Sequence, residues 1–192
     1  MAKYVIVYAH PNPHSFNHAI LTEIESALKR QGKDYLLRDL NALPFHPVLT
    51  AADLISLVQG RIPPEILAEQ EFIARADTII FVHPIWWFNM PAILKGYIDR
   101  VFSRGFAYDV VEGNPVGLLT DKKVMLFNTT GGSQENYLKF GYDIAIKTAI
   151  DQGVFEFCGM TIAMHKMFYA VPSVDMRRRE AMLSEIRDIV FD

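Results

Sequence analysis

The chain has 192 residues, of which 51% are hydrophobic and 21% are charged, and its formal net charge is −3 at pH 7. This length and composition fit a single globular domain spanning residues 1–192. The slightly acidic balance provides no basic surface for a nucleic-acid backbone, so nucleic acid is excluded as the expected partner.

Cys158 is the only cysteine of the chain, which excludes an intrachain disulfide and a cysteine-rich metal site. Because it lies in an apolar run, we expect a buried and unreactive thiol. The chain opens without the pattern of a secretory signal, and no apolar stretch reaches about 18 residues. We therefore expect a cytoplasmic protein with no segment inserted in a membrane.

The first third of the chain alternates short apolar runs with segments of helical period. The continuously apolar run Tyr4–Tyr8 predicts a strand buried on both faces. A helix ending near Gly32 is predicted by apolar residues repeated every four positions, Phe16, Ile20, Ile24 and Leu28. A second strand follows at Tyr35–Leu40, and the two prolines within residues 41–62 then predict a long loop with a short helical turn.

The remaining elements continue this alternation. Pro63 and Pro64 open a helix, Thr78–Val82 is a third strand, and Pro91 opens another helix. Residues 104–121 are rich in glycine, proline and acidic residues and predict a loop. After it we expect a strand at Lys123–Asn128, a helix over about 136–151, a strand at Val154–Met160 and a helix from about Asp175.

Five strands separated by helices predict an α/β fold with three layers, in which helices cover both faces of a doubly wound parallel sheet. The flavodoxin-like strand order 2-1-3-4-5 is one common solution for five strands. In such a sheet the ligand crevice lies at the carboxyl ends of the strands. Functional residues are therefore expected directly after each strand.

After the first strand, a helix begins around Ser15 to Asn17, and its free amides and positive dipole end face the expected crevice. This arrangement suits a phosphate group, with His10, Ser15 and Asn17 as side-chain donors. Alternatively, Ser15 or Asn17 simply caps the helix. No G-x-G-x-x-G fingerprint or Walker A loop follows this strand, which disfavours a Rossmann-type NAD site. A metal site is not expected, because prolines separate the nearby histidines.

After the third strand, Trp86, Trp87 and Phe88 stand in a turn between Pro84 and Pro91. Three aromatic residues in a rigid turn at the ligand end favour a platform for a flat conjugated ring over core packing alone. After the fourth strand, the paired glycines 131 and 132 would let backbone amides approach a ligand closely. Amides aimed at one edge of a heterocycle would stabilise negative charge there.

Together these segments resemble the NAD(P)H:quinone oxidoreductase family, which has the flavodoxin-like fold. The resemblance covers most of the chain in order and is most specific in the third-strand loop and the helix after it. The matching stretches include Ser15-Phe16-Asn17, Ala68-Glu69-Gln70, Pro84 through Arg100, Phe106-Ala107-Tyr108, Thr129-Thr130-Gly131-Gly132-Ser133 and Phe157-Cys158-Gly159.

The resemblance implies a bound flavin, FAD with FMN as the other possibility, and NAD(P)H as co-substrate. It places the phosphates, the isoalloxazine ring and the far edge of the ring in three groups of residues. These groups are His10, Ser15, Phe16 and Asn17; Pro84, Ile85, Trp86, Trp87 and Phe88; and Thr129, Thr130, Gly131, Gly132 and Tyr137. Arg179 is spaced like an arginine near the adenosine end. The resemblance also implies a homodimer in which the second subunit completes each site, with Tyr108 and Phe157 in the substrate pocket.

The chain departs from the family pattern at some positions. Val110 stands where a tyrosine is expected, and no histidine matches the one that follows the Tyr137 position in mammalian members. Stabilisation of the reduced ring would then fall to Tyr137 alone, the expected catalytic residue, or Tyr142 would substitute for the missing histidine. The segment around Gln59 is short, which leaves FAD and FMN both open.

The implied reaction is a two-electron, ping-pong transfer of hydride from NAD(P)H through the flavin to a quinone or a similar acceptor. Azo or nitro compounds are alternative acceptors for the same site. Two alternative functions are a flavin-bearing regulatory subunit of a potassium-efflux transporter and an electron-carrying flavodoxin. The net charge of −3 argues against the flavodoxin, because flavodoxins are usually strongly acidic.

Overall fold

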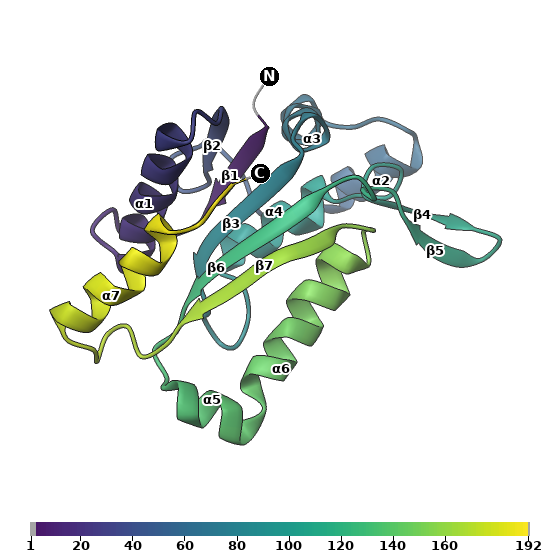
Figure 1. The fold of residues 1–192 in the computed structure, drawn as a ribbon. Helices are drawn as coiled ribbons and strands as arrows, with labels where there is room; N and C mark the ends of the chain where they lie inside the picture. Colours follow the sequence, from purple (N-terminus) through teal and green to yellow (C-terminus); the bar gives the residue numbers. More distant parts are fainter. Residues whose placement is uncertain (1–2, 192) are drawn as a thin grey trace.

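The computed structural model describes residues 3–191 and contains a parallel sheet of five strands between two layers of helices (Figure 1). The strand order is β2-β1-β3-β6-β7, so the expected order 2-1-3-4-5 is confirmed. The strands of this sheet are β1 (Tyr4–Tyr8), β2 (Tyr35–Asp39), β3 (Thr78–Pro84), β6 (Lys123–Thr129) and β7 (Thr161–Phe168).

A separate hydrophobic cluster lies on each face of the sheet. On one face, α1 (Phe16–Arg30) and α7 (Met176–Arg187) pack against alternate residues of the central strands, such as Ile6 and Ile80. The neighbouring residues Val5 and Ile79 point to the other face. That face is covered by α3 (Pro64–Arg75), α4 (Ala92–Val101), α6 (Tyr142–Lys147) and the π-helix η1 (Thr148–Glu156). Burial on both faces explains why the central strands are apolar throughout.

The predicted fifth strand at Val154–Met160 is wrong. That segment ends η1 and turns, and the fifth strand is β7, several residues later. Phe155 and Cys158 are buried while Glu156 and Phe157 are exposed, which is a helical pattern rather than an alternating one. Because β7 lies at the edge of the sheet and carries polar residues, its sequence lacks the continuous apolar run of a central strand.

Three loop and helix predictions also need correction. Residues 104–121 contain a hairpin of β4 (Tyr108–Val111) and β5 (Asn114–Gly117), joined through Glu112 and Gly113 at φ 52° and 81°, both central residues in the left-handed region as in a type I′ turn. The short helical turn expected within 41–62 is the helix α2 (Ala51–Val58), capped by Thr50 and Asp53. The helix expected over about 136–151 is broken by Gly141 at φ 68° into α5 (Gln134–Phe140) and α6.

The register of the sheet brings the strand ends to one edge. Tyr8 of β1 pairs with Val82 of β3, and Pro84 of β3 pairs with Thr129 of β6. The segments that follow these three strands therefore emerge side by side. Among residues 3–191, no helix combines the length and the apolar character needed to cross a bilayer.

Candidate functional site

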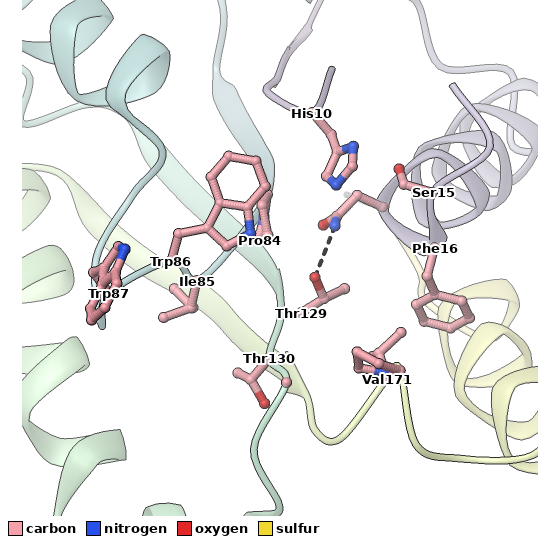
Figure 2. Close-up of a pocket in the computed structure, with 13 residues that line it drawn as sticks. His10, Ser15, Phe16, Pro84, Ile85, Trp86, Trp87, Thr129, Thr130 and Val171 are labelled. Atoms are coloured by element: carbon pink, nitrogen blue, oxygen red, sulfur yellow. Dashed lines mark hydrogen bonds between the residues drawn. The ribbon is translucent and has the colours of Figure 1, made fainter. Parts of the chain in front are cut away.

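A pocket of about 430 Å³ lies at the carboxyl ends of β1, β3 and β6 (Figure 2). The aromatic turn (Trp86–Phe88) and the glycine turn (Gly131 and Gly132) were expected to converge. This is confirmed, because residues of both turns line this pocket together with the start of α1. The lining residues are His10, Ser15, Phe16, Asn17, Pro84, Ile85, Trp86, Trp87, Thr129, Thr130, Gly131, Val171 and Pro172. The volume falls within the usual range of small-molecule sites.

The start of α1 provides hydrogen-bond donors at one end of the pocket. Ser15 is the N-cap, and its Oγ accepts from the amide of His18 at 3.2 Å, so the capping role considered for Ser15 is confirmed. The Nδ1 atom of His10 accepts from the amide of Asn12 at 3.0 Å. Burial lowers the pKa of His10, and in the neutral ring the proton must then lie on Nε2. Together with the positive end of the helix dipole, the donors at His10 Nε2 and at the Ser15 hydroxyl suit an anion.

Asn17 connects α1 to the end of β6. Its Nδ2 donates to Thr129 Oγ1 at 2.8 Å, the dashed line in Figure 2, and both residues are buried. Its Oδ1 is buried and has no partner among the residues that the structure describes. A buried acceptor without a donor is costly. Because Asn17 lines the pocket, a donor on a bound molecule would satisfy this oxygen.

The aromatic turn after β3 has a strained backbone and exposed rings. Trp87 and Phe88 adopt φ of 51° and 58°, in the left-handed region that bulky residues rarely occupy. The backbones of Trp86 and Asn89 exchange two hydrogen bonds of 3.0 Å, which hold the turn closed. The Trp87 side chain is 96% exposed. Strain and exposed aromatic area at one turn indicate a surface shaped for a ligand rather than for core packing.

The paired glycines after β6 have different roles. A Cβ on Gly131 would enter open space, whereas a Cβ on Gly132 would lie 2.8 Å from the ring of Tyr137. Gly131 therefore keeps the pocket open, and Gly132 makes room for Tyr137. Tyr137 itself is buried behind the turn, where its ring contacts Phe88, Tyr142 and Tyr169. Burial raises the pKa of its hydroxyl.

Six predicted site residues do not line the pocket. Phe88 and Gly132 lie next to lining residues, and Tyr137 lies behind them. Arg179 reaches the pocket wall indirectly, since its Nη2 donates to the carbonyl of Val171 at 3.0 Å. The rings of Tyr108 and Phe157 contact each other, with centroids 5.3 Å apart, outside this pocket.

Val171 and Pro172 are lining residues that the sequence analysis missed. They belong to the segment after β7, and the amides of Thr130 and Val171 bond to the carbonyls of Phe168 and Thr130 across that end. The rule that function follows each strand would have identified them. It failed here because the fifth strand was predicted too early in the chain.

The residues present fit a flavin better than a metal ion. Among residues 3–191, no group of three or more histidine, cysteine, aspartate or glutamate side chains is placed to hold a metal. The pocket instead combines a helix N-terminus, an open glycine turn, an unsatisfied amide oxygen and an aromatic turn. These groups can bind a phosphate at one end and a flat heterocycle at the other.

Comparison with known proteins gives a consistent result. A family model described as "Flavodoxin-like fold" matches residues 2–190. A Haemophilus influenzae protein named "Uncharacterized NAD(P)H oxidoreductase" is 39% identical over 181 residues, covering 94% of this chain and 90% of that protein. The human "Ribosyldihydronicotinamide dehydrogenase [quinone]" is 32% identical, covering 95% and 87%. An NAD(P)H:quinone oxidoreductase structure from Methanothermobacter marburgensis has a TM-score of 0.87 at 26% identity, covering 97% and 96%.

Proposed function

The chain belongs to the family with the flavodoxin-like fold that includes the NAD(P)H:quinone oxidoreductases, and on that basis we propose that it is a flavin-dependent NAD(P)H oxidoreductase that reduces a quinone or a similar acceptor. The observation that carries the proposal is the pocket, where the start of α1, the aromatic turn and the Gly131 turn meet. The relatives described above are named as NAD(P)H-dependent oxidoreductases or quinone dehydrogenases. This favours an enzyme over the regulatory subunit of a transporter.

The three parts of the pocket would hold the three parts of the cofactor. His10, Ser15 and the first amides of α1 would bind the phosphates, since they are the donors at that end. Trp86 and Trp87 would support the ring, and the backbone at Thr130 and Gly131 would face its polar edge. Arg179, held against Val171, would lie toward an adenosine group, which makes FAD our first choice and FMN the second. When bound, the flavin accepts a hydride equivalent from NAD(P)H and passes two electrons to the acceptor.

Tyr137 would stabilise negative charge on the reduced ring through the turn in front of it. Its buried hydroxyl keeps its proton, because burial raises its pKa, and it can therefore act as a hydrogen-bond donor. The variant Tyr137→Phe should slow reduction by NAD(P)H more than it weakens flavin binding. Loss of flavin with unchanged turnover per bound flavin would contradict this role.

We further infer that NAD(P)H and the acceptor use the same open face of the pocket in turn, which gives a ping-pong order. Tyr108 and Phe157 lie outside the pocket of their own chain, so they could act only in the site of a second subunit. Sedimentation of the purified protein should then give a dimer. Initial rates at several fixed acceptor concentrations should give parallel double-reciprocal lines, and intersecting lines would contradict the shared site.

The proposed activity is tested most directly by a visible spectrum of purified protein after incubation with FAD or FMN. We expect the absorption bands of a bound flavin and their bleaching by NADH or NADPH without oxygen. Adding a water-soluble benzoquinone should restore the bands. Protein that stays colourless with both flavins, or flavin that neither nucleotide bleaches, would refute the proposal.

A further inference from the structure

A chain of buried polar side chains runs beneath the floor of the pocket and is not used in the mechanism above. Asp151 Oδ1 lies 2.7 Å from His165 Nδ1, and His165 Nε2 lies 2.7 Å from Asn128 Oδ1. Asn128 Nδ2 lies 3.0 Å from His83 Nε2, and His83 Nδ1 lies 2.9 Å from the carbonyl oxygen of Pro84. Asn128 and His83 each stand one residue before a lining residue, Thr129 or Pro84.

Two carbonyl oxygens fix the direction of the hydrogen bonds that Asn128 and His83 make. Asn128 Nδ2 also lies 3.3 Å from the backbone oxygen of His83, and a carbonyl oxygen can only accept, so the amide orientation is determined. Since the Asn128 amide nitrogen donates, His83 Nε2 must accept, and His83 Nδ1 must carry the proton that it donates to Pro84. Full burial lowers the pKa of His83 to about 4, which agrees with a neutral ring.

The same reasoning gives the proton count at the other end. Asn128 Oδ1 can only accept, so His165 Nε2 must donate to it. His165 Nδ1 then faces the Asp151 carboxyl at 2.7 Å, a contact that requires a proton between nitrogen and oxygen. The His165 and Asp151 side chains are only 3% and 11% exposed, so solvent has little access to either side chain.

Two irregularities of the backbone bring this pair together. The pairing of β6 with β7 shifts by one residue between Val124 and Met125, which leaves Ala163 as an extra residue in β7. Such a bulge turns the following side chains to the opposite face. It places His165 opposite Leu126, on the face covered by η1. Asp151 lies within the π-helical turns of η1, and such turns are frequent at functional sites.

We propose that Asp151 and His165 share one buried proton and act as positioning residues for the pocket. Through Asn128 and His83 they fix the position of the Pro84 carbonyl, and with it the position of the aromatic turn that follows. The amide that follows this carbonyl, that of Ile85, donates to Thr129 at 2.8 Å, which links the two turns of the pocket floor. The effect on flavin rests on the proposed function, whereas the proton arrangement does not.

The first test reads the ring nitrogens of flavin-free protein by NMR after labelling the histidines with ¹⁵N. We expect His83 to be protonated on Nδ1 and unprotonated on Nε2. We expect His165 to be protonated on Nε2 and to share a proton at Nδ1. In the variant Asp151→Asn, the introduced amide can donate to His165 Nδ1. His165 Nδ1 should then be unprotonated, while both histidine rings keep their other protons. A His83 ring protonated on Nε2, or a His165 Nδ1 that the variant does not change, would overturn the proposal.

The second test separates positioning from general stability. In His165→Gln the longer amide can still donate to Asn128, whereas in His165→Asn it is too short. His165→Asn should shift the Ile85 amide signal and raise the Kd for FAD or FMN by about tenfold, the effect of losing about one buried hydrogen bond. His165→Gln should restore most of both values, and the exposed Asp121→Asn should change neither.

The outcomes distinguish this inference from the proposed function. The expected ring protonation and Ile85 shift in a protein that binds no flavin would refute the proposed function and leave the shared proton and the turn intact. An unchanged Ile85 signal and an unchanged flavin Kd in His165→Asn would refute the positioning role, even if the protein reduces quinones.

Discussion

Removal of the Asn17 side chain tests the pocket most sharply, because its two amide atoms have opposite effects on the flavin-free protein. The variant Asn17→Ala removes the buried hydrogen bond to Thr129, which costs about 1 kcal/mol. It also removes a buried Oδ1 without a partner among the described residues, which recovers about 1–3 kcal/mol. We expect a net change between about zero and a gain of about 2 kcal/mol, so Tm should rise by no more than about 8 °C.

With flavin bound, only a loss remains, because the ligand donor would lose its acceptor. The Kd for FAD or FMN should rise about tenfold, equivalent to about 1.4 kcal/mol, and the increase in Tm on adding flavin should shrink accordingly. Differential scanning fluorimetry with and without flavin measures both values, with the exposed helical Asn136→Ala as the matched control. A large loss of stability in flavin-free Asn17→Ala, or an unchanged flavin Kd, would refute this reasoning.

Three further predictions follow from local geometry. Gly131→Ala should weaken flavin binding with little change in Tm, because its Cβ would enter open space. Gly132→Ala should instead cost about 1–3 kcal/mol of stability, because its Cβ would lie 2.8 Å from the Tyr137 ring. The reverse pattern would contradict the two roles. Burial raises the pKa of Cys158 from 9.0 to about 11, so its alkylation at pH 8 should be at least about 100-fold slower than in the urea-unfolded chain, and equal rates would show an accessible thiolate. Folding lowers the pKa of His83 from 6.5 to about 4, so between pH 6.5 and about pH 4 the unfolded state binds a proton that the folded state does not. The free energy of unfolding should therefore fall by up to about 3 kcal/mol as the pH drops through that range. Urea titrations of His83→Gln should lack this contribution.

Much of the fold followed from patterns within short segments. The apolar runs at Tyr4–Tyr8 and Thr78–Val82 identified central strands, because a strand covered on both faces has no polar side. Edge strands lack this property. β7 exposes part of its length and carries His165 and Lys166, so its sequence did not resemble a buried strand. The hairpin turn at Glu112 and Gly113 was missed for a different reason, because glutamate is not typical of a turn position with positive φ.

The site could be predicted as far as the strand-end rule reached. His10, Asn17, Trp86 and Gly131 lie in the segments that follow strands whose positions were predicted correctly, and they line one pocket. Val171 was missed because it follows the misplaced strand. The different roles of Gly131 and Gly132 depend on where the Tyr137 ring lies, which no spacing in the sequence reveals.

The sequence by itself determined the layered α/β architecture and the strand ends that form the pocket, because hydrophobic period and turn residues act over a few neighbouring positions. Only the tertiary structure decided which polar groups are satisfied and which protons they hold. His83, Asn128, Asp151 and His165 are distant in sequence, and a bulge of one residue in β7 and the π-helical turns of η1 bring them into one chain of hydrogen bonds. Such contacts depend on register and burial, which arise only when the sheet and its helices have packed together.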